Sequence, residues 1–404
     1  MAPAEHTVAA ARAEILAGVG ALPSESVGIE AAPGRTLAEA VVAARAQPPF
    51  RSSAMDGYGV RAADLGSEPF AVLGEAAAGR PYGGAPMRAR GAIRIFTGAA
   101  VPAGVDLVVP QERTRREGAT LWLDAATQRR ANIREAGVDF AAGELLVRAG
   151  VRLNARHVAL VAASGAAAVR VVRRPRVAVL ATGDELVRPG AAAGPHQIFD
   201  SVSFGVGASI GEWGGEPLPL ATRPDSQTAI AAAAAEALRQ ADLLVVIGGA
   251  SVGDYDVVKQ SLAGLGARIA VERVAVRPGR PTWFARAAER PVLGLPGNPA
   301  AALVCAHLFL RPLLHAMLGR DAHGNSAAAL LEGEVAAGGA YELYLRAVAT
   351  RGEDGRLRAR PCDDQDTSLL SVFAAANVLI RRPAQAAAAA SGAPVEVLSL
   401  EELV

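Results

Sequence analysis

The sequence predicts a multidomain α/β plus β protein built around one doubly wound α/β domain. Its 404 residues exceed the length of one ordinary domain. From residue 174 to residue 322, apolar strand-like runs alternate with segments of helical spacing, the element order of a doubly wound sheet. Residues 47–139 and 323–404 contain short strands separated by glycines, which is typical of β-rich domains. We therefore expect four domains: an N-terminal domain of residues 1–46 and 140–173, a β-rich insert of residues 47–139, an α/β domain of residues 174–322 and a C-terminal β-barrel-like domain of residues 323–404.

The N-terminal domain and the insert are expected to differ in their elements. Apolar residues at helical spacing predict a helix over residues 7–18, and LAEAVVAARA predicts a second over residues 37–46. Pro48-Pro49 favours extended chain and marks a boundary. In the insert and the segment that returns from it, short strands are expected at residues 70–76, 91–98, 106–112 and 119–125, with short β-type segments over 140–172.

The α/β domain begins with a strand from residue 176 that breaks at Gly183. Asn298 is a good N-cap and Pro299 a good first residue for the helix that closes the domain. Ligands of such sheets bind beyond the carboxyl ends of the strands, where TGDEL, GGASVGDYD and LPGNP all fall. Between these ends, helices are expected at residues 201–212, 229–239 and 256–264, and β segments at 217–221, 243–247, 268–276, 282–287 and 291–295.

The C-terminal region returns to β-type patterns. The Ala-rich run 384–393 is expected to be a surface helix or loop. Strands are expected at residues 330–336, 341–351, 355–361, 378–382 and 395–399.

Composition excludes several functional classes. With 51% apolar and 20% charged residues the chain can bury a large core, and its net charge of +1 predicts neither a nucleic-acid nor a membrane-surface partner. Two distant cysteines imply no disulfide framework or zinc site. Charges interrupt the apolar N-terminal stretch and the helix around residues 300–318, so neither a signal peptide nor a membrane span is expected. We expect a cytoplasmic protein.

The stretch from Leu243 to Lys259, LLVVIGGASVGDYDVVK, carries the clearest chemical signal. An apolar strand that breaks into Gly248-Gly249 allows backbone N–H groups to approach a ligand closely. Carboxylates in the same loop indicate a hard cation, and Mg²⁺ can bridge carboxylates to phosphate. Lys259 is the only lysine in the sequence. The stretch therefore predicts a phosphate-plus-metal site, and the alternative is an ordinary polar turn.

Four clusters need a common explanation. Each cluster is a segment rich in glycine, hydroxyl groups and carboxylates. They are SAMDGYG at 53–59; FTGAAVPAGVDLVVPQE at 96–112; TGDEL at 182–186; and the 248–259 loop together with VRPGRP at 276–281 and LPGNP at 295–299.

In these motifs and their order, the chain resembles the molybdopterin molybdenumtransferases, the MoeA and gephyrin E-domain family, over essentially its whole length. The resemblance implies a MogA-like α/β molybdopterin-binding domain, an elongated linker domain, the β-rich insert and a C-terminal β domain. It implies insertion of molybdenum from molybdate into adenylylated molybdopterin, with release of AMP and a requirement for Mg²⁺. It also implies a homodimer whose cleft lies between the α/β domain of one subunit and the insert of the other, and a possible molybdopterin adenylyltransferase partner.

The resemblance also implies functional residues at matching positions. Catalytic roles are expected for Asp56, Thr97, Asp139, Glu185, Asp225 and Asp256, with Glu185 and Asp256 as metal ligands. Substrate-binding roles are expected for Gly248, Gly249, Ser251, Gly253, Lys259, Arg277, Arg280, Pro296, Gly297, Asn298, Arg134, Arg346, Thr367 and Ser368.

The chain departs from the family pattern at a few of these positions. Arg277 and Arg280 stand where lysine is usual, and Val202 stands where asparagine is frequent. In the turn 365–368, Asp366 adds a negative charge near the expected anion site. Two alternatives therefore stand beside the transferase: a non-catalytic molybdopterin-binding or scaffold protein, and a molybdopterin adenylyltransferase, whose related fold also carries GGxS-type loops.

Overall fold

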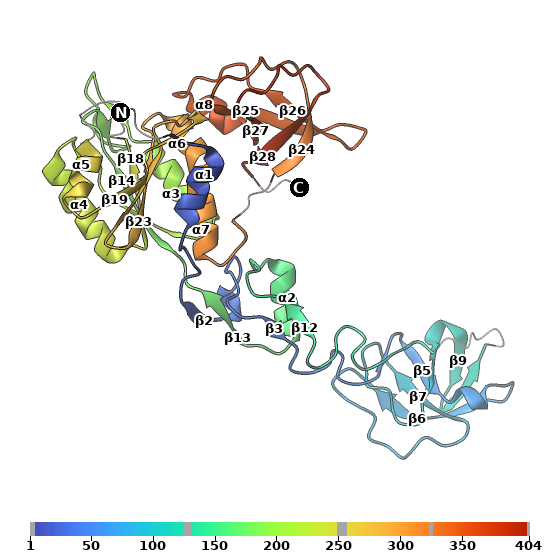
Figure 1. The fold of residues 1–404 in the computed structure, drawn as a ribbon. Helices are drawn as coiled ribbons and strands as arrows, with labels where there is room; N and C mark the ends of the chain where they lie inside the picture. The colour runs from blue at the N-terminus through green and yellow to red at the C-terminus, as the bar shows by residue number, and fades with distance from the viewer. Residues whose placement is uncertain (1–4, 125–130, 249–256, 323–325, 402–404) are drawn as a thin grey trace. The chain divides into compact units, whose positions relative to one another are not determined.

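The structure is a computed structural model that describes residues 5–124, 131–248, 257–322 and 326–401 (Figure 1). The chain divides into two units. One consists of residues 1–25, 34–38 and 171–404, and the other of residues 26–33 and 39–170. The first unit contains the α/β and C-terminal domains, and the second contains the insert.

The α/β domain is built on a six-stranded sheet of order β17-β14-β18-β23-β22-β19. The first four strands are parallel, and β22 and β19 continue the sheet antiparallel. The elements before the C-terminal domain are β1 (Glu5–His6), α1 (Val8–Leu16), β14 (Arg176–Ala181), β15 (Leu186–Val187), β16 (Ile198–Phe199), α3 (Val202–Glu212), β17 (Glu216–Pro219), α4 (Gln227–Gln240), β18 (Leu243–Ile247), α5 (Val257–Ala263), β19 (Arg268–Val271), β20 (Arg273–Val274), β21 (Val276–Arg277), β22 (Trp283–Ala287), β23 (Arg290–Leu295), α6 (Pro299–Cys305), a π-helical turn (Ala306–Leu310) and α7 (Arg311–Met317).

Side chains that alternate along the central strands form two cores. Val179 and Val245 face the core that includes α1, α3, α6 and α7, whereas Leu180 and Val246 face the core with α4 and α5. Because both faces of the parallel strands are covered, these strands read as continuous apolar runs. Helices therefore lie on both sides of the sheet (Figure 1), and the predicted doubly wound arrangement is confirmed.

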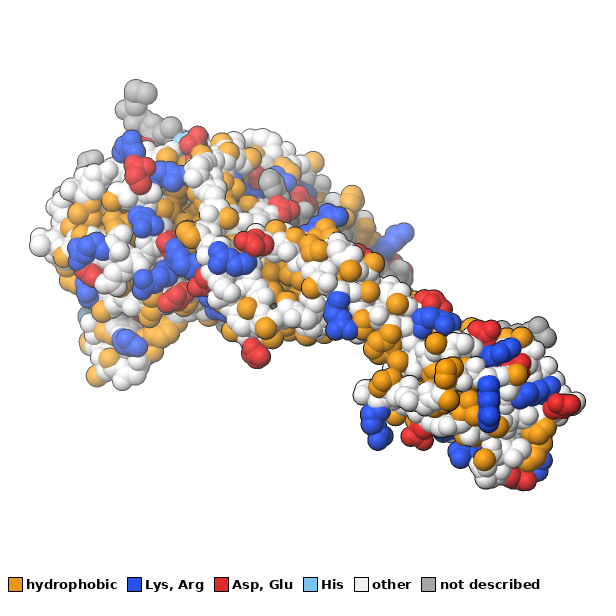
Figure 2. Space-filling model, turned by 90° about the horizontal axis from the view of Figure 1, so that it is seen from below, with side chains coloured by type: hydrophobic (Ala, Val, Ile, Leu, Met, Phe, Trp, Pro, Cys, Tyr) orange, Lys and Arg blue, Asp and Glu red, His pale blue; other side chains and the backbone are white. Residues whose placement is uncertain are grey.

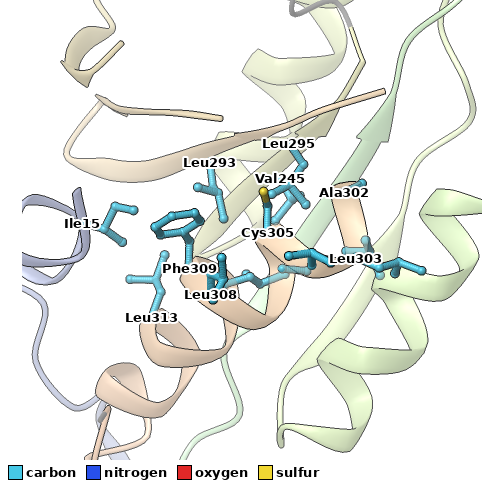
Figure 3. Packing of buried hydrophobic residues seen from close by; sticks show 14 of the residues in the cluster. Ile15, Val245, Leu293, Leu295, Ala302, Leu303, Cys305, Leu308, Phe309 and Leu313 are labelled. Atoms are coloured by element: carbon cyan, nitrogen blue, oxygen red, sulfur yellow. The ribbon is translucent and has the colours of Figure 1, made fainter. Parts of the chain in front are cut away.

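The most apolar helical stretch belongs to the first core. Phe309 and Leu313 lie against Ile15 of α1 and Leu293 of β23 (Figure 3). Among the described residues, Pro299–Met317 is the one helix long and apolar enough to cross a membrane, and 78% of its most apolar window is buried inside the molecule. Its composition is explained by this packing.

The C-terminal domain closes on itself. Strand order β21-β25-β26-β24-β28-β27, together with a β25–β27 pairing, makes a barrel around small and β-branched side chains such as Ala347, Val378 and Val397. Its elements are β24 (Ser326–Leu331), β25 (Glu342–Arg351), β26 (Leu357–Pro361), α8 (Leu370–Ala375), β27 (Val378–Arg382) and β28 (Pro394–Ser399). The expectation of a β-barrel-like domain is confirmed.

The second unit contains a six-stranded sheet of order β8-β5-β7-β6-β10-β9, in which β6 and β7 are parallel. Tyr58 and Leu107 pack on one side of it, and Ile93 and Val108 on the other. The elements from residue 24 to residue 172 are β2 (Ser24–Gly28), a 3₁₀ turn (Ile29–Ala31), β3 (Val41–Val42), β4 (Ser52–Ser53), β5 (Gly57–Val60), a 3₁₀ turn (Ala62–Asp64), β6 (Phe70–Ala76), β7 (Gly91–Ile95), β8 (Leu107–Pro110), a 3₁₀ turn (Gln111–Arg113), β9 (Thr114–Glu117), β10 (Thr120–Leu123), β11 (Ile133–Arg134), β12 (Leu145–Val147), α2 (Ala155–Ala163) and β13 (Ala168–Val172).

Two sequence expectations about local structure are wrong. Residues 37–46 form no helix, because Val41–Val42 pairs as β3 with β12, and this pairing outweighs the alanine content. Within 140–172, residues 155–163 form α2 instead of β structure, since Asn154 accepts from the backbone N–H of His157 and the His157 ring bonds back in a capping box. Helix α8 was not foreseen either.

Charged groups are mixed on the surface. On the face drawn in Figure 2, acidic and basic side chains alternate instead of gathering by sign. That face therefore carries no large patch of a single charge sign.

Candidate functional site

A cavity of about 650 Å³ lies beyond the carboxyl ends of β14, β18 and β23. This strand-end cavity collects three of the loops singled out in the sequence and one residue of the C-terminal domain. Its lining includes Thr182, Gly183, Glu185, Leu186, Ile198, Phe199, Asp225, Ile247, Gly248, Pro281, Pro296, Gly297, Asn298 and Ser368. The parallel topology thus brings together motifs that are more than a hundred residues apart, as predicted for a doubly wound sheet.

Glycine at position 248 is needed for this convergence. Gly248 has φ +90°, and a Cβ there would lie 2.6 Å from the carbonyl oxygen of Thr182. A Cβ at Gly297 would lie 3.6 Å from the Cα of Gly248, so the two loops approach each other at backbone distance. The glycines therefore leave room for a narrow junction of the loops that follow β14, β18 and β23.

Carboxylates gather at one part of the cavity. The backbone N–H of Asp225 donates to Asp184 Oδ1 at 3.2 Å, and both Glu185 and Asp225 line the cavity. Partial burial raises the pKa of Asp225, and the negative charges of Asp184 and Glu185 raise it further. This part of the cavity thus favours a ligand that donates hydrogen bonds or carries positive charge.

The predicted Mg²⁺ site is only partly visible. Glu185 faces the cavity, but Asp256 lies outside the described residues. Within the described ranges, no group of three or more His, Cys, Asp or Glu side chains could hold a metal ion. The described residues alone therefore do not make a magnesium site.

The helix start at LPGNP contacts the C-terminal domain. Asn298 Nδ2 donates to Thr367 Oγ1 at 2.8 Å, and the backbone N–H of Ala300 donates to the carbonyl of Thr367 at 2.9 Å. In the same turn, the backbone N–H and the hydroxyl of Ser368 both donate to Asp366 Oδ1. The backbone N–H of Ser368, followed by its hydroxyl, lowers the pKa of Asp366. The turn 365–368 is thereby fixed against the mouth of the strand-end cavity.

Arg346 of β25 holds this turn from the face of the strand opposite the barrel core. Its side chain is 1% exposed; its guanidinium donates to the carbonyl of Asp366 at 2.7 Å and to Gln365 Oε1 at 3.3 Å. Gln365 Nε2 donates back to the carbonyl of Arg346 at 2.9 Å. Burial lowers the pKa of Arg346. These contacts direct the guanidinium at the turn.

A second cavity of about 490 Å³ lies beside the same turn. This Arg277 cavity is lined by Arg277 and Pro278, by residues 343–345 of β25, and by Gln365, Asp366 and Thr367. Arg277 is the one basic residue among the described residues that line it. A small oxyanion placed here would meet one exposed guanidinium and one carboxylate.

Two other predicted cations point elsewhere. Arg280 forms an ion pair with Glu5 and lies 5.5 Å from the ring centre of Tyr341, and it is not among the lining residues of either cavity. The Lys259 ammonium lies 5.8 Å from the ring centre of Trp283, which is fully buried in the core. Trp283 is thus a core residue.

The insert carries its own polar group. Asp56 Oδ1 accepts from the backbone N–H of Thr97 at 2.7 Å and from its hydroxyl at 2.8 Å. These bonds, the backbone one first, lower the pKa of Asp56, and the nearby charge of Arg94 adds to the effect. Asp56 and Thr97, both predicted as site residues, are therefore in contact within the insert, and the Asp56 carboxylate is exposed and ionised.

The two remaining predicted residues of this unit lie in the returning chain. Arg134 belongs to β11, which pairs with β4 just before the Asp56 loop. The backbone N–H of Asp139 donates to the carbonyl of Gln47. Their side chains are exposed.

Some predicted site residues lie outside the described residues, and some residues that line the strand-end cavity were not predicted. Gly249, Ser251 and Gly253, like Asp256, belong to the first group. Thr182 and Phe199 line the strand-end cavity without having been selected as site residues. Thr182 is the first polar residue after the buried run of β14, and that position was the available signal.

Comparison with known families and proteins agrees with this geometry. Family models match three parts of the chain: the MoeA N-terminal region (domains I and II) at residues 6–165, a probable molybdopterin-binding domain at 178–316, and the MoeA C-terminal region (domain IV) at 328–400. The strand-end cavity lies within the second match, apart from Ser368, which belongs to the third.

Similar proteins extend over most of the chain. A molybdopterin molybdenumtransferase of Nostoc is 39% identical over 306 residues, covering 73% of this chain and 70% of the relative. One of Bacillus subtilis is 33% identical, covering 94% and 90%. A solved molybdopterin biosynthesis MoeA protein from Pyrococcus horikosii is 28% identical, with a TM-score of 0.85 over 99% of this chain and 100% of that one. The chain belongs to the molybdopterin molybdenumtransferase family of transferases.

Proposed function

We propose that this protein inserts molybdenum from molybdate into adenylylated molybdopterin and releases AMP in a magnesium-dependent reaction in the cytoplasm. One observation carries the proposal. The strand-end cavity joins the loops of the probable molybdopterin-binding domain to Ser368 of the C-terminal domain, and the adjoining turn also lines the Arg277 cavity. Two neighbouring sites suit a reaction that brings together a pterin and an oxyanion.

The chain's own residues supply binding and orientation. The carboxylates of Glu185 and Asp225 line the cavity where the pterin would lie. Arg277 supplies positive charge for molybdate, because a guanidinium forms fork-like hydrogen bonds with tetrahedral oxyanions. Asp56, held ionised by Thr97, is assigned a catalytic role on the insert. Mg²⁺, when bound, would screen the phosphate charges, with Glu185 and Asp256 as its proposed ligands.

The direct test follows AMP release and cofactor formation with adenylylated molybdopterin, molybdate and Mg²⁺. Wild-type protein should release AMP only when molybdate is present. Glu185→Ala and Asp56→Ala should abolish insertion while the protein stays folded. Glu236→Ala on α4, which replaces a half-buried acid, and Glu68→Ala in the insert, which replaces an exposed one, should retain activity. Normal turnover in both site variants would refute the residue assignment, and absent molybdate-dependent AMP release would refute the function.

A homodimer with a two-subunit site is part of the proposal. If Asp56 and Glu185 act from different subunits, mixing inactive Asp56→Ala and Glu185→Ala proteins and allowing subunits to exchange should restore activity. No recovery in mixed dimers would count against it. A copurifying molybdopterin adenylyltransferase would identify the proposed partner.

A non-catalytic binding role is favoured by one observation. Asp366 places a carboxylate beside Arg277 in the cavity assigned to the oxyanion. Tight pterin binding without turnover would support this second function, and ATP-dependent adenylylation of molybdopterin would instead support an adenylyltransferase.

A further inference from the structure

A buried hydroxyl in the strand-end cavity lacks a partner. Thr182 is 3% exposed, and its Oγ1 makes no hydrogen bond within the described part of the chain. Another buried threonine of the domain differs: Thr282 is 1% exposed, and its hydroxyl donates to the carbonyl of Gly279 at 2.7 Å. Burying a hydroxyl without a partner is unfavourable, so an orphan that lines a cavity points to a ligand.

The surroundings of Thr182 define that ligand. Asp225 shares the cavity lining, and the nearby Thr182 hydroxyl, as a potential donor, opposes the rise in the pKa of Asp225, but the two side chains do not meet at hydrogen-bond distance and angle. Glu185 and Asp225 accept hydrogen bonds when ionised, and no Lys or Arg occurs among the described residues that line the cavity. A bare phosphate or molybdate would be repelled there, because like charges at short range destabilise each other.

The remaining lining favours a flat ring. Leu186, Phe199, Ile247 and Pro296 contribute apolar surface to the same cavity, and the side chain of Phe199 is 49% exposed. A planar heteroaromatic group with N–H donors along one edge satisfies both the apolar walls and the carboxylates.

We propose that Thr182, together with Asp225, reads the donor-rich aminopyrimidinone edge of a pteridine. The inference rests on the proposed function and names the part of the substrate that each residue contacts. Asp225 accepts from the exocyclic amino group and the adjacent ring N–H, a bidentate pattern suited to a carboxylate. The Thr182 hydroxyl donates to the neighbouring ring nitrogen, and thereby gains the partner it lacks.

The test measures binding alone, with 2-amino-4-oxopteridine and 2,4-dioxopteridine as probes titrated into the full chain. Wild-type protein should prefer the amino compound. Thr182→Val should bind it roughly tenfold more weakly, as expected for one lost neutral hydrogen bond, and should unfold at an unchanged or higher temperature. Thr182→Ser should bind like wild type. Asp225→Asn should reduce the preference for the amino compound.

Thr282→Val is the matched control. It should lower the unfolding temperature, because it removes a satisfied buried hydroxyl, but it should leave pteridine affinity unchanged below that temperature. Unchanged affinity in folded Thr182→Val, or equal affinity of wild type for the two probes, would overturn the inference. No molybdate, Mg²⁺ or turnover enters this measurement, so a failure of molybdenum insertion and a failure of pteridine recognition are distinguishable.

Discussion

Replacing Gly248 by alanine separates two costs that the structure imposes on the junction of the β14 and β18 loops. The first cost is backbone strain: at φ +90° an L-residue in the folded state is strained by about 1–2 kcal/mol. Alanine also lowers the entropy of the unfolded chain, which offsets roughly 0.4–1 kcal/mol of that strain. The second cost is steric, because the new Cβ would lie 2.6 Å from the carbonyl oxygen of Thr182. That oxygen belongs to a buried residue whose N–H donates to Ile247 at 3.0 Å, so it can move little.

Gly190 provides the matched control. Its φ is +89°, nearly that of Gly248, but a Cβ at Gly190 would have no neighbour within 4 Å. Gly190→Ala should therefore destabilise the protein by about 1 kcal/mol or less, which is the backbone cost alone. Gly248→Ala should add about 1–3 kcal/mol of overpacking.

The two variants can be compared by differential scanning calorimetry and tryptophan fluorescence. One kcal/mol corresponds to roughly 2–4 °C for a domain of this size, so Gly248→Ala should unfold several degrees below Gly190→Ala. It should also bind pteridine more weakly, because Thr182 must move. Equal unfolding temperatures for the two variants would refute the argument that the loops approach at backbone distance.

Two further predictions concern carboxylates. Thr97→Val removes the hydroxyl donor from Asp56, so the pKa of Asp56 should rise toward its usual 3.8. The stability that Asp56 gains from its lowered pKa is present above that value and is lost as the pH falls through the folded-state pKa. An NMR titration should show Asp56 protonating at higher pH in the variant than in wild type, and an unchanged midpoint would contradict the assignment. Asp366→Asn keeps an acceptor for Ser368 but removes a charge from the Arg277 cavity, so the KM for molybdate should fall by a few-fold without loss of folding, and a raised KM would show that the carboxylate aids binding.

The sequence predicts the α/β domain well because its signals are local and redundant. The apolar runs at 176–181, 243–247 and 290–295 are strands in the structure, and Asn298-Pro299 starts a helix as expected. Parallel topology then places the strand ends at one edge, which accounts for the position of the strand-end cavity. The strands β22 and β19 were expected, but their antiparallel direction could not be foreseen, because pairing direction leaves no local trace.

Expectations from composition failed where pairing decides the structure. Residues 37–46 read as a helix by their alanines, yet Val41 and Val42 pair with β12, which is about a hundred residues later in the chain. Such long-range pairing overrides a weak propensity. The helix that begins at Ala155 is the opposite case, because its signal is local: Asn154 is an N-cap residue three positions before His157, and the expectation of β structure over 140–172 overlooked it.

Three arginines expected to bind the oxyanion differ in what they can do. Arg280 is paired with Glu5, and Arg346 is buried with its guanidinium on the 365–366 backbone, so neither offers free charge to the Arg277 cavity. Among the described residues that line that cavity, Arg277 alone therefore supplies positive charge to attract an oxyanion, and the Asp366 carboxylate opposes that attraction. Arg346 acts instead through shape: it fixes the turn that carries Thr367 and Ser368. A loss of Arg277 should thus weaken molybdate binding directly, whereas a loss of Arg346 should first disorder the turn.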